Sequence, residues 1–278
     1  MNLERLNIKD FTIEEPESQD YILEFGKRIE ELDWNKIKET LESVRDKKWH
    51  DFFIGIRAIK LVYPNKSKEI ELDEEVWEEM NVGMDFCRKN QGPYMQNLAN
   101  DIITISVLDY EKLKELVTKD DVEIIKQDLE KHQERMSLQD LARFNAELIA
   151  MKVLGQEDVE KRWVNEDFWN EMKTILNRER QDENARTFCW LAADMKIIFP
   201  ERDKELNIDN NQWRKMVELL DGANPLEPQF GFTRYLSIAE ELKILSSEKV
   251  EITDNVLELV PHISGESESH LMPEVRSF

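Results

Sequence analysis

The chain has 278 residues, of which 60 are acidic and 38 are basic, so its formal net charge is -22. Nucleic-acid backbones and anionic membrane surfaces both attract basic segments, and this charge therefore argues against either as a partner. Only two cysteines occur, Cys87 and Cys189, which excludes a disulfide framework. Hydrophobic residues make up 40% of the chain and glycine contributes only 8 residues, so we expect a folded, helix-rich protein.

The N-terminal segment MNLERLNIKDFTIEEPE has no apolar core region and no small-residue cleavage site, so it does not resemble a secretory signal. The longest uncharged, mainly aliphatic stretch is IITISVL. A membrane helix needs at least about 18 apolar residues, far more than this stretch provides. We therefore expect a cytoplasmic protein in which residues 1–16 form an N-terminal arm.

A spacing of Lys, Trp and Met recurs along the chain. In each copy the Trp follows the Lys by 17 positions and the Met follows the Trp by three: Lys60, Trp77 and Met80; Lys152, Trp169 and Met172; Lys196, Trp213 and Met216. Extending this register gives one apolar anchor per unit, 40 to 47 residues apart: Ile37, Trp77, Val122, Trp169, Trp213 and Leu257. The chain is therefore expected to be a helical repeat, since a fixed period of this length is typical of repeat folds.

Each anchor is preceded by the signals of a helix start. A good N-cap residue stands four positions before it: Asp33, Asp73, Thr118, Asn165, Asp209 or Thr253. An apolar residue comes immediately before each of these: Leu32, Leu72, Val117, Val164, Ile208 or Ile252. An apolar N′ residue facing an apolar N4 residue across an N-cap is the hydrophobic staple. The pattern therefore predicts that the second helix of every unit begins just after its N-cap, with the anchor buried.

The first helix of each unit is expected to end near AIKLVYP, LIAMKVLG, ADMKIIFP or AEELKIL, where Pro64 and Pro200 stop the helix and Gly155 caps it. The segment DIITISVL, Asp101 to Leu108, is rich in β-branched residues and resembles a strand locally. The repeat register places it in a first helix. We follow the register, because local propensity is a weak predictor that tertiary context overrides.

The predicted fold is all-α, with a repeat domain at 17–260 and a flexible tail at 261–278. Its units are approximately 17–48, 49–91, 95–136, 137–181, 182–222 and 229–260. This organisation resembles the HEAT, armadillo and tetratricopeptide repeats, and the period favours the HEAT-like class. The resemblance implies a right-handed α-solenoid or α-α superhelix of about five or six helical hairpins. Such folds hold a protein or peptide partner on an extended face.

No motif for chemistry is present. The four histidines, His50, His132, His262 and His270, show no metal-ligand spacing, and no GxxxxGK[ST], GxGxxG or GxSxG occurs. Cys87 and Cys189 lie in apolar contexts typical of small buried residues. We expect no catalytic residue, metal or cofactor.

Positions that break the repeat are the candidates for partner binding. They are Trp163 in a charged connector, Phe230 and Phe232 at the end of the stretch DGANPLEPQFGF, and Leu271, Met272 and Phe278 in the tail. The leading hypothesis is a non-catalytic interaction, scaffold or adaptor protein whose acidic surface prefers a basic or amphipathic partner. The alternative is an enzyme or an accessory subunit with a site that has no linear motif; a deep pocket holding carboxylates with shifted pKa values would favour it. A nucleic-acid-associated regulator would require a contiguous basic face.

Overall fold

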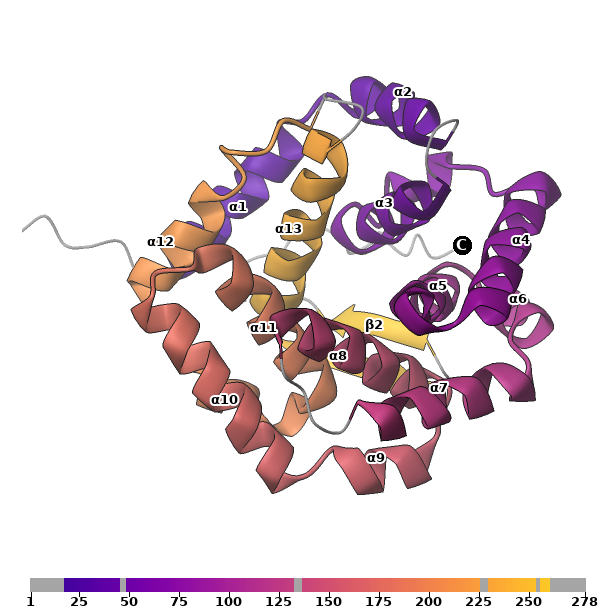
Figure 1. Ribbon diagram of the computed structural model, residues 1–278. Helices are drawn as coiled ribbons and strands as arrows, with labels where there is room; N and C mark the ends of the chain where they lie inside the picture. Colours follow the sequence, from indigo (N-terminus) through magenta and orange to yellow (C-terminus); the bar gives the residue numbers. More distant parts are fainter. Residues whose placement is uncertain (1–17, 46–48, 133–136, 226–229, 254–255, 261–278) are drawn as a thin grey trace, which may run out of the picture.

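The computed structural model describes residues 18–45, 49–132, 137–225, 230–253 and 256–260 and is mainly helical, which confirms the predicted all-α class (Figure 1). None of the described helices is long and apolar enough to cross a membrane. The elements are α1 (Ser18–Glu30), α2 (Trp34–Arg45), α3 (Trp49–Val62), η1 (Ser67–Glu69), α4 (Glu74–Asn90), η2 (Gly92–Tyr94), α5 (Met95–Leu108), α6 (Tyr110–Leu116), α7 (Lys119–Lys131), α8 (Leu138–Val153), α9 (Glu157–Trp163), α10 (Glu166–Gln181), α11 (Ala185–Ile198), η3 (Pro200–Leu206), α12 (Asn210–Glu218), α13 (Phe230–Ser246), β1 (Lys249–Thr253) and β2 (Val256–Val260).

The first helices of the second to sixth predicted units form an inner ring. Helix α3 packs on α5, α5 on α8, α8 on α11, and α11 on α13, and α13 returns to pack on α3 (Figure 1). The β-branched segment 101–108 lies in α5, so the helix predicted from the repeat register is confirmed there. Inner helices are covered on several sides, which explains why α5 is buried over most of its residues rather than along one stripe.

The second helices form an outer layer around this ring. Helices α2 and α4 pack on α3, α7 packs on α8, and α10 and α12 pack on α11. The N-terminal helix α1 packs on α12 and α13, and Arg28 Nη1 lies 2.6 Å from Asp221 Oδ1 beyond the end of α12. Both layers therefore close, with the first and last units in contact. In a solenoid each repeat contacts only its neighbours, so the predicted solenoid arrangement is not confirmed.

The predicted helix starts are confirmed in five units. One N-cap side chain in each accepts a hydrogen bond from a backbone amide of the first turn: Asp33, Asp73, Thr118, Asn165 and Asp209. Thr118 and Asp209 also form reciprocal capping boxes with the third residue of their helices. The anchors Ile37, Trp77, Trp169 and Trp213 are buried, and Val122 is half-buried. The N-cap hydrogen bond therefore marks the start of each of these helices.

The last unit departs from the prediction. Residues 249–253 and 256–260 form an antiparallel hairpin, in which Val250 pairs with Leu259 and Ile252 with Leu257. The prediction that Thr253 caps a helix anchored by Leu257 is wrong. Apolar and polar residues alternate in these two segments, as is typical of strands. Ile252 and Leu257 are five positions apart, which coincides with the spacing of the apolar residue before an N-cap and its anchor.

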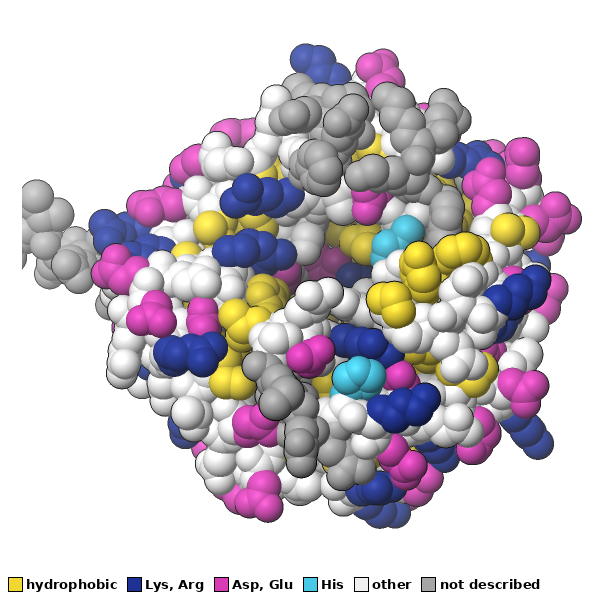
Figure 2. All heavy atoms as spheres, viewed as in Figure 1, with side chains coloured by type: hydrophobic (Ala, Val, Ile, Leu, Met, Phe, Trp, Pro, Cys, Tyr) yellow, Lys and Arg dark blue, Asp and Glu magenta, His cyan; other side chains and the backbone are white. Residues whose placement is uncertain are grey.

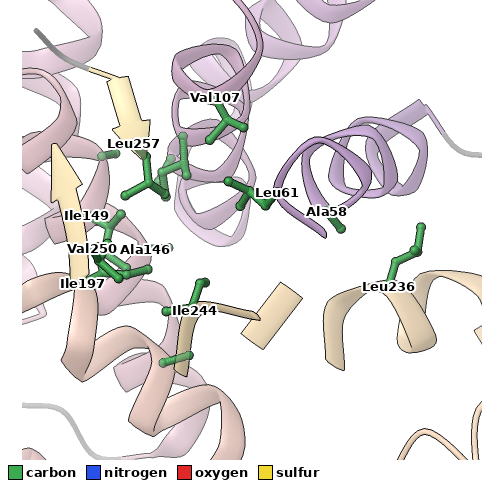
Figure 3. Close-up of a cluster of buried hydrophobic side chains, with 14 of the residues drawn as sticks. Ala58, Leu61, Val107, Ala146, Ile149, Ile197, Leu236, Ile244, Val250 and Leu257 are labelled. Carbon is green, nitrogen blue, oxygen red and sulfur yellow. The ribbon is translucent and has the colours of Figure 1, made fainter. Parts of the chain in front are cut away.

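The hairpin closes one end of the ring interior. Val250 and Leu257 are 3% exposed. Figure 3 shows them beside Ala146 and Ile149 of α8 and Ile197 of α11, with Ile244 of α13 nearby. Strand β2 contacts α5, and β1 contacts α11. The hairpin thus takes the place of a second helix and forms a floor beneath the inner helices.

The recurring Lys of the repeat has a structural role between units. Lys196 is 3% exposed, and its Nζ donates to the carbonyls of Leu245 and Ser247 at the end of α13, at 3.1 and 2.6 Å. Lys152 Nζ donates in the same way to the carbonyls of Ile197 and Ile198 at the end of α11. The last carbonyls of a helix lack partners within the helix and carry partial negative charge. Each Lys therefore caps the next inner helix of the ring.

Candidate functional site

A cavity of about 290 Å³ lies at the centre of the inner ring. All five inner helices line it, and Leu257 of β2 contributes to its floor. In Figure 2 this face of the molecule is hollowed near the middle of the ring. Its wall combines aliphatic side chains and the indole of Trp190 with charged residues of α3, α11 and α13. Concave sites with mostly apolar walls and a few polar groups are the usual form of small-molecule sites in proteins.

One ion pair in the cavity wall joins α3 to α13. Arg57 Nε donates to Glu240 Oε1 at 2.8 Å, and Arg57 Nη2 donates to Glu240 Oε2 at 3.2 Å. The side chains are only 13% and 8% exposed. Two parallel hydrogen bonds of this kind fix the guanidinium and the carboxylate in one geometry. The pair therefore fastens the last inner helix to the first and balances its own charge.

A second pair joins α11 to α13. Arg186 forms an ion pair with Glu241 and donates a hydrogen bond to Ser237 Oγ at 3.2 Å. Ser237 Oγ in turn donates to Glu241 Oε1 at 3.1 Å. Burial raises the pKa of Glu241, and the neighbouring Arg186 opposes that shift. The positive charge of Arg186 is therefore paired with the carboxyl of Glu241.

A third carboxyl in the cavity wall, that of Asp194 on α11, has a neutral partner. Asn145 of α8 is fully buried and donates from Nδ2 to Asp194 Oδ2 at 3.0 Å. Burial raises the pKa of Asp194 to about 7, and the carboxylates of Glu241 and Glu240 act in the same direction. The Asn145 hydrogen bond and the charge of Arg57 oppose this shift. Asp194 therefore changes protonation near neutral pH, inside the cavity.

The cysteines occupy the buried positions expected from the sequence. Burial raises the pKa of the Cys189 thiol well above its ordinary value, and it raises the pKa of Cys87 to about 12. Both thiols are fully shielded from solvent. Since the thiolate is the reactive form, these environments suppress nucleophilic chemistry at both residues.

The structure describes the side chains of two of the residues predicted for partner binding, Trp163 and Phe232. Trp163 is half-buried at the end of α9, where its ring packs edge-on against Phe144 at 5.7 Å between centroids and Arg162 lies over it at 4.7 Å. Phe230 begins α13. Leu271, Met272 and Phe278 lie outside the described residues.

Phe232 lies in the core of the described structure. Its side chain is fully buried, and its ring lies 3.6 Å from the position where a Cβ would extend from Gly55 of α3. The phenyl group of Phe232 therefore packs between α13 and α3, at the contact that closes the ring of inner helices. The sequence pattern assigns Phe232 to a loop-like stretch. The packing of α13 on α3 is a tertiary contact, and no local sequence signal predicts it.

The cavity carboxyls were missed, although the repeat register carries a signal for them. Counted back two positions from the recurring Lys, the other units have Ala58, Ile103 and Ala150, whereas α11 has Asp194. The equivalent position of α13, two before Lys243, is Glu241. A charge in place of an apolar residue on an inner helix marks a departure from packing. Within the described ranges no group of three or more His, Cys, Asp or Glu is arranged to hold a metal.

The site cannot be assigned by similarity to known proteins. No protein-family model matches the chain, and neither the search of curated proteins nor that of solved structures finds a match.

Proposed function

We propose that this protein binds a small polar molecule in the cavity at the centre of its helical ring. The observation that carries the proposal is Asp194, a carboxyl in the cavity wall whose direct partner is the neutral amide of Asn145. Burying an ionisable group without an opposite charge costs stability, so such groups are concentrated at functional sites. The apolar wall and the indole of Trp190 supply contact area for the remainder of the ligand.

For the fold, we propose an α-α superhelix of paired helices that winds tightly enough for its last unit to meet its first. The staples of the outer layer and the Lys caps between inner helices support this description. Ring closure turns the inner face of the superhelix into an enclosed wall. A ligand of matching size is therefore favoured on that face over an extended peptide.

A second candidate function is the predicted adaptor, supported by an exposed apolar patch. Val82 and Phe86 lie one turn apart on α4 and are 69% and 47% exposed, and the Phe86 ring packs against Tyr94 at 4.9 Å. Figure 2 shows hydrophobic surface gathered near α4 and α5, to one side of the hollow. Exposed Glu78 precedes Val82 by one turn, so the patch would suit a partner with apolar and basic side chains.

The enzyme alternative rests on the same cavity. A carboxyl with a pKa near neutrality suits general acid or base catalysis. The hydroxyl in the cavity wall, Ser237 Oγ, is hydrogen-bonded to Arg186 and Glu241. Binding is therefore the function that the geometry supports best, with proton exchange at Asp194 as its chemical capability.

The proposal is tested by ligand-observed NMR with a panel of cationic, anionic and neutral fragments. The wild-type protein is compared with Ala142→Phe, which places a ring in the cavity from a half-buried position on α8. We expect some fragments to bind the wild type and to lose at least about tenfold in affinity in the variant, since a filled pocket excludes them. If every bound fragment binds both proteins equally, the cavity is not the binding site.

Two controls separate the cavity from other surfaces. Ala185→Phe introduces the same ring at the start of α11, outside the central cavity, and should leave fragment binding unchanged. The double variant Val82→Ser and Phe86→Ser removes the exposed patch on α4 and should also leave it unchanged. Loss of fragment binding in the double variant would instead place the binding site on α4.

A further inference from the structure

We infer that the central cavity selects a small organic cation, such as a protonated amine with a short apolar portion, through Asp194. This inference rests on the proposed function and specifies its ligand class. It follows from the charges of the cavity wall, which leave one carboxyl without a cation of its own.

The cation of the cavity wall, Arg57, and the cation next to the wall, Arg186, are both already paired with carboxylates. Arg57 is held by both oxygens of Glu240, and Arg186 is held by Glu241 and Ser237. An anionic ligand would have to displace one of these carboxylates or share its cation. Each displacement would leave a buried carboxylate without its cation, which is a costly arrangement. The wall therefore offers little to an anion.

The carboxyl of Asp194 offers more hydrogen-bond acceptors than its neighbours supply donors. Asn145 Nδ2 donates to Oδ2 of the carboxyl, whereas no described group donates a hydrogen bond to Asp194 Oδ1. Asn145 Oδ1 also lacks a partner among these groups, but Asn145 is fully buried and does not line the cavity. The neighbouring charges are Arg57 on α3, Glu240 and Glu241 on α13, and Arg186 on α11; the residues of α5 that line the cavity are uncharged. A donor that carries positive charge complements this surplus.

The remaining wall limits the rest of the ligand. A cavity of about 290 Å³ has the volume of about ten water molecules, at roughly 30 Å³ each. Ile103, Ile149, Ile197 and Ile244 provide apolar contact from four inner helices, and Trp190 provides an aromatic surface that also attracts cations. A short alkyl or aryl amine satisfies both the charge and the volume.

Binding of such a cation is coupled to protonation of Asp194. The cation pairs with the ionised carboxyl, so binding below the pKa of Asp194, about 7, must release its proton. Affinity should therefore rise by up to about tenfold for each pH unit between pH 5 and 7 and level off above that range. An anion would show the opposite slope, and a neutral ligand would show little slope.

The test uses three probes of equal chain length: butylammonium, butanol and butyrate. Their dissociation constants are measured by NMR titration against the wild type, Asp194→Asn and Ala142→Phe. We expect butylammonium to bind the wild type at least about tenfold more tightly than butyrate, because its charge complements Asp194. Asp194→Asn should remove both this preference and the rise with pH while keeping the fold, since Asn has nearly the size and shape of Asp and lacks the ionisable carboxyl. Ala142→Phe should weaken all binding.

The outcomes distinguish failure of the inferred ligand class from failure of the proposed function. Equal binding of all three probes, lost in Ala142→Phe, would support cavity binding and overturn selection of a cation. Preference for butyrate, or butylammonium affinity that falls as the pH rises, would also overturn it. If butylammonium binds the wild type and Ala142→Phe equally, or binds neither, the inference is overturned. The proposed function is then tested by whether other fragments bind the wild type and lose affinity in Ala142→Phe.

Discussion

The outer and inner helices of the ring use polar residues in opposite ways. Two buried polar residues of the outer layer stabilise the start of their own helix, because Asp121 and Gln212 complete capping boxes. A third, Glu179 of α10, accepts a hydrogen bond from Asn184, the N-cap of the next helix in the chain, α11. The inner ring instead places Arg57, Asp194 and Glu240 around a shared cavity, where their partners come from other helices.

This difference separates residues that build the fold from residues that build the site. A cap is satisfied within one turn of its helix, so it contributes to folding wherever the helix packs. The charges of the cavity wall meet their partners only when the inner helices have packed: Asp194 meets Asn145 when α11 packs on α8, and Glu240 meets Arg57 when α13 returns to α3. We therefore expect outer-layer substitutions to change stability without changing the cavity, and inner-ring substitutions to change the pH dependence and ligand preference.

The largest expected effect is on stability, at the outer staple Trp213. This side chain is 5% exposed beneath α12, and Trp213→Ala should lower the free energy of unfolding by about 3 to 5 kcal/mol, since it leaves a large cavity. Urea denaturation measures the loss. Trp163→Ala, at a half-buried position, should cost less. A near-neutral Trp213→Ala would show that the staple is not part of the core.

An inner-ring substitution should change how stability depends on pH. The pKa of Asp194 is raised to about 7, so the folded state holds this proton more tightly than the unfolded state, whose carboxyl has a pKa of about 3.9. The stabilisation is fully present below that unfolded value and is lost as the pH rises toward 7. Relative to Asp194→Asn, the wild type should lose up to about 4 kcal/mol across this window and change little above it.

Denaturation curves of both proteins between pH 4 and 8 measure this difference directly. Other carboxyls, such as Glu147 with its pKa raised to about 9, also titrate with folding, but they are common to both proteins and cancel in the comparison. Glu123→Gln removes an exposed acidic side chain of the outer helix α7 and serves as the control. A constant difference between wild type and Asp194→Asn at every pH would show that Asp194 is not held in its protonated form.

The outer layer was predictable because its signals are local. Asp73, Asn165 and Asp209 stand at fixed distances from their anchors, and a cap and a staple are completed within one helical turn. Ring closure was not predictable, because the contact of Phe232 with α3 joins residues far apart in the chain. The hairpin was hidden by a coincidence of spacing, although the alternation of Val250, Ile252, Leu257 and Leu259 with polar residues indicates strands.

The cavity could be located only in part from sequence. Asp194 and Glu241 stand out where other units have apolar residues, which is a signal that a register alignment contains. Their pairing with Asn145 and Arg186 depends on which helices become neighbours in the ring. A one-residue anomaly can therefore mark a candidate site, while its chemistry follows from the tertiary structure.

The smallest expected effect concerns the Lys residues that link neighbouring inner helices. Lys196→Met keeps a long side chain but removes the donor for the carbonyls of Leu245 and Ser247, and it leaves Asp203 without the ammonium 3.1 Å away. The loss should be about 1 to 3 kcal/mol, the cost of buried polar groups left without a partner. Thermal and urea denaturation measure it.

Lys60→Met provides the matched comparison, because Lys60 occupies the same register at the end of α3 but is exposed. Its replacement should change stability by less than about 0.5 kcal/mol, as is usual for exposed positions. Equal losses at both positions would contradict the role of burial and carbonyl capping at Lys196. A loss confined to Lys196 would show that the repeated residue acquires its structural role from the helix end it reaches, and that the sequence repeat alone does not confer that role.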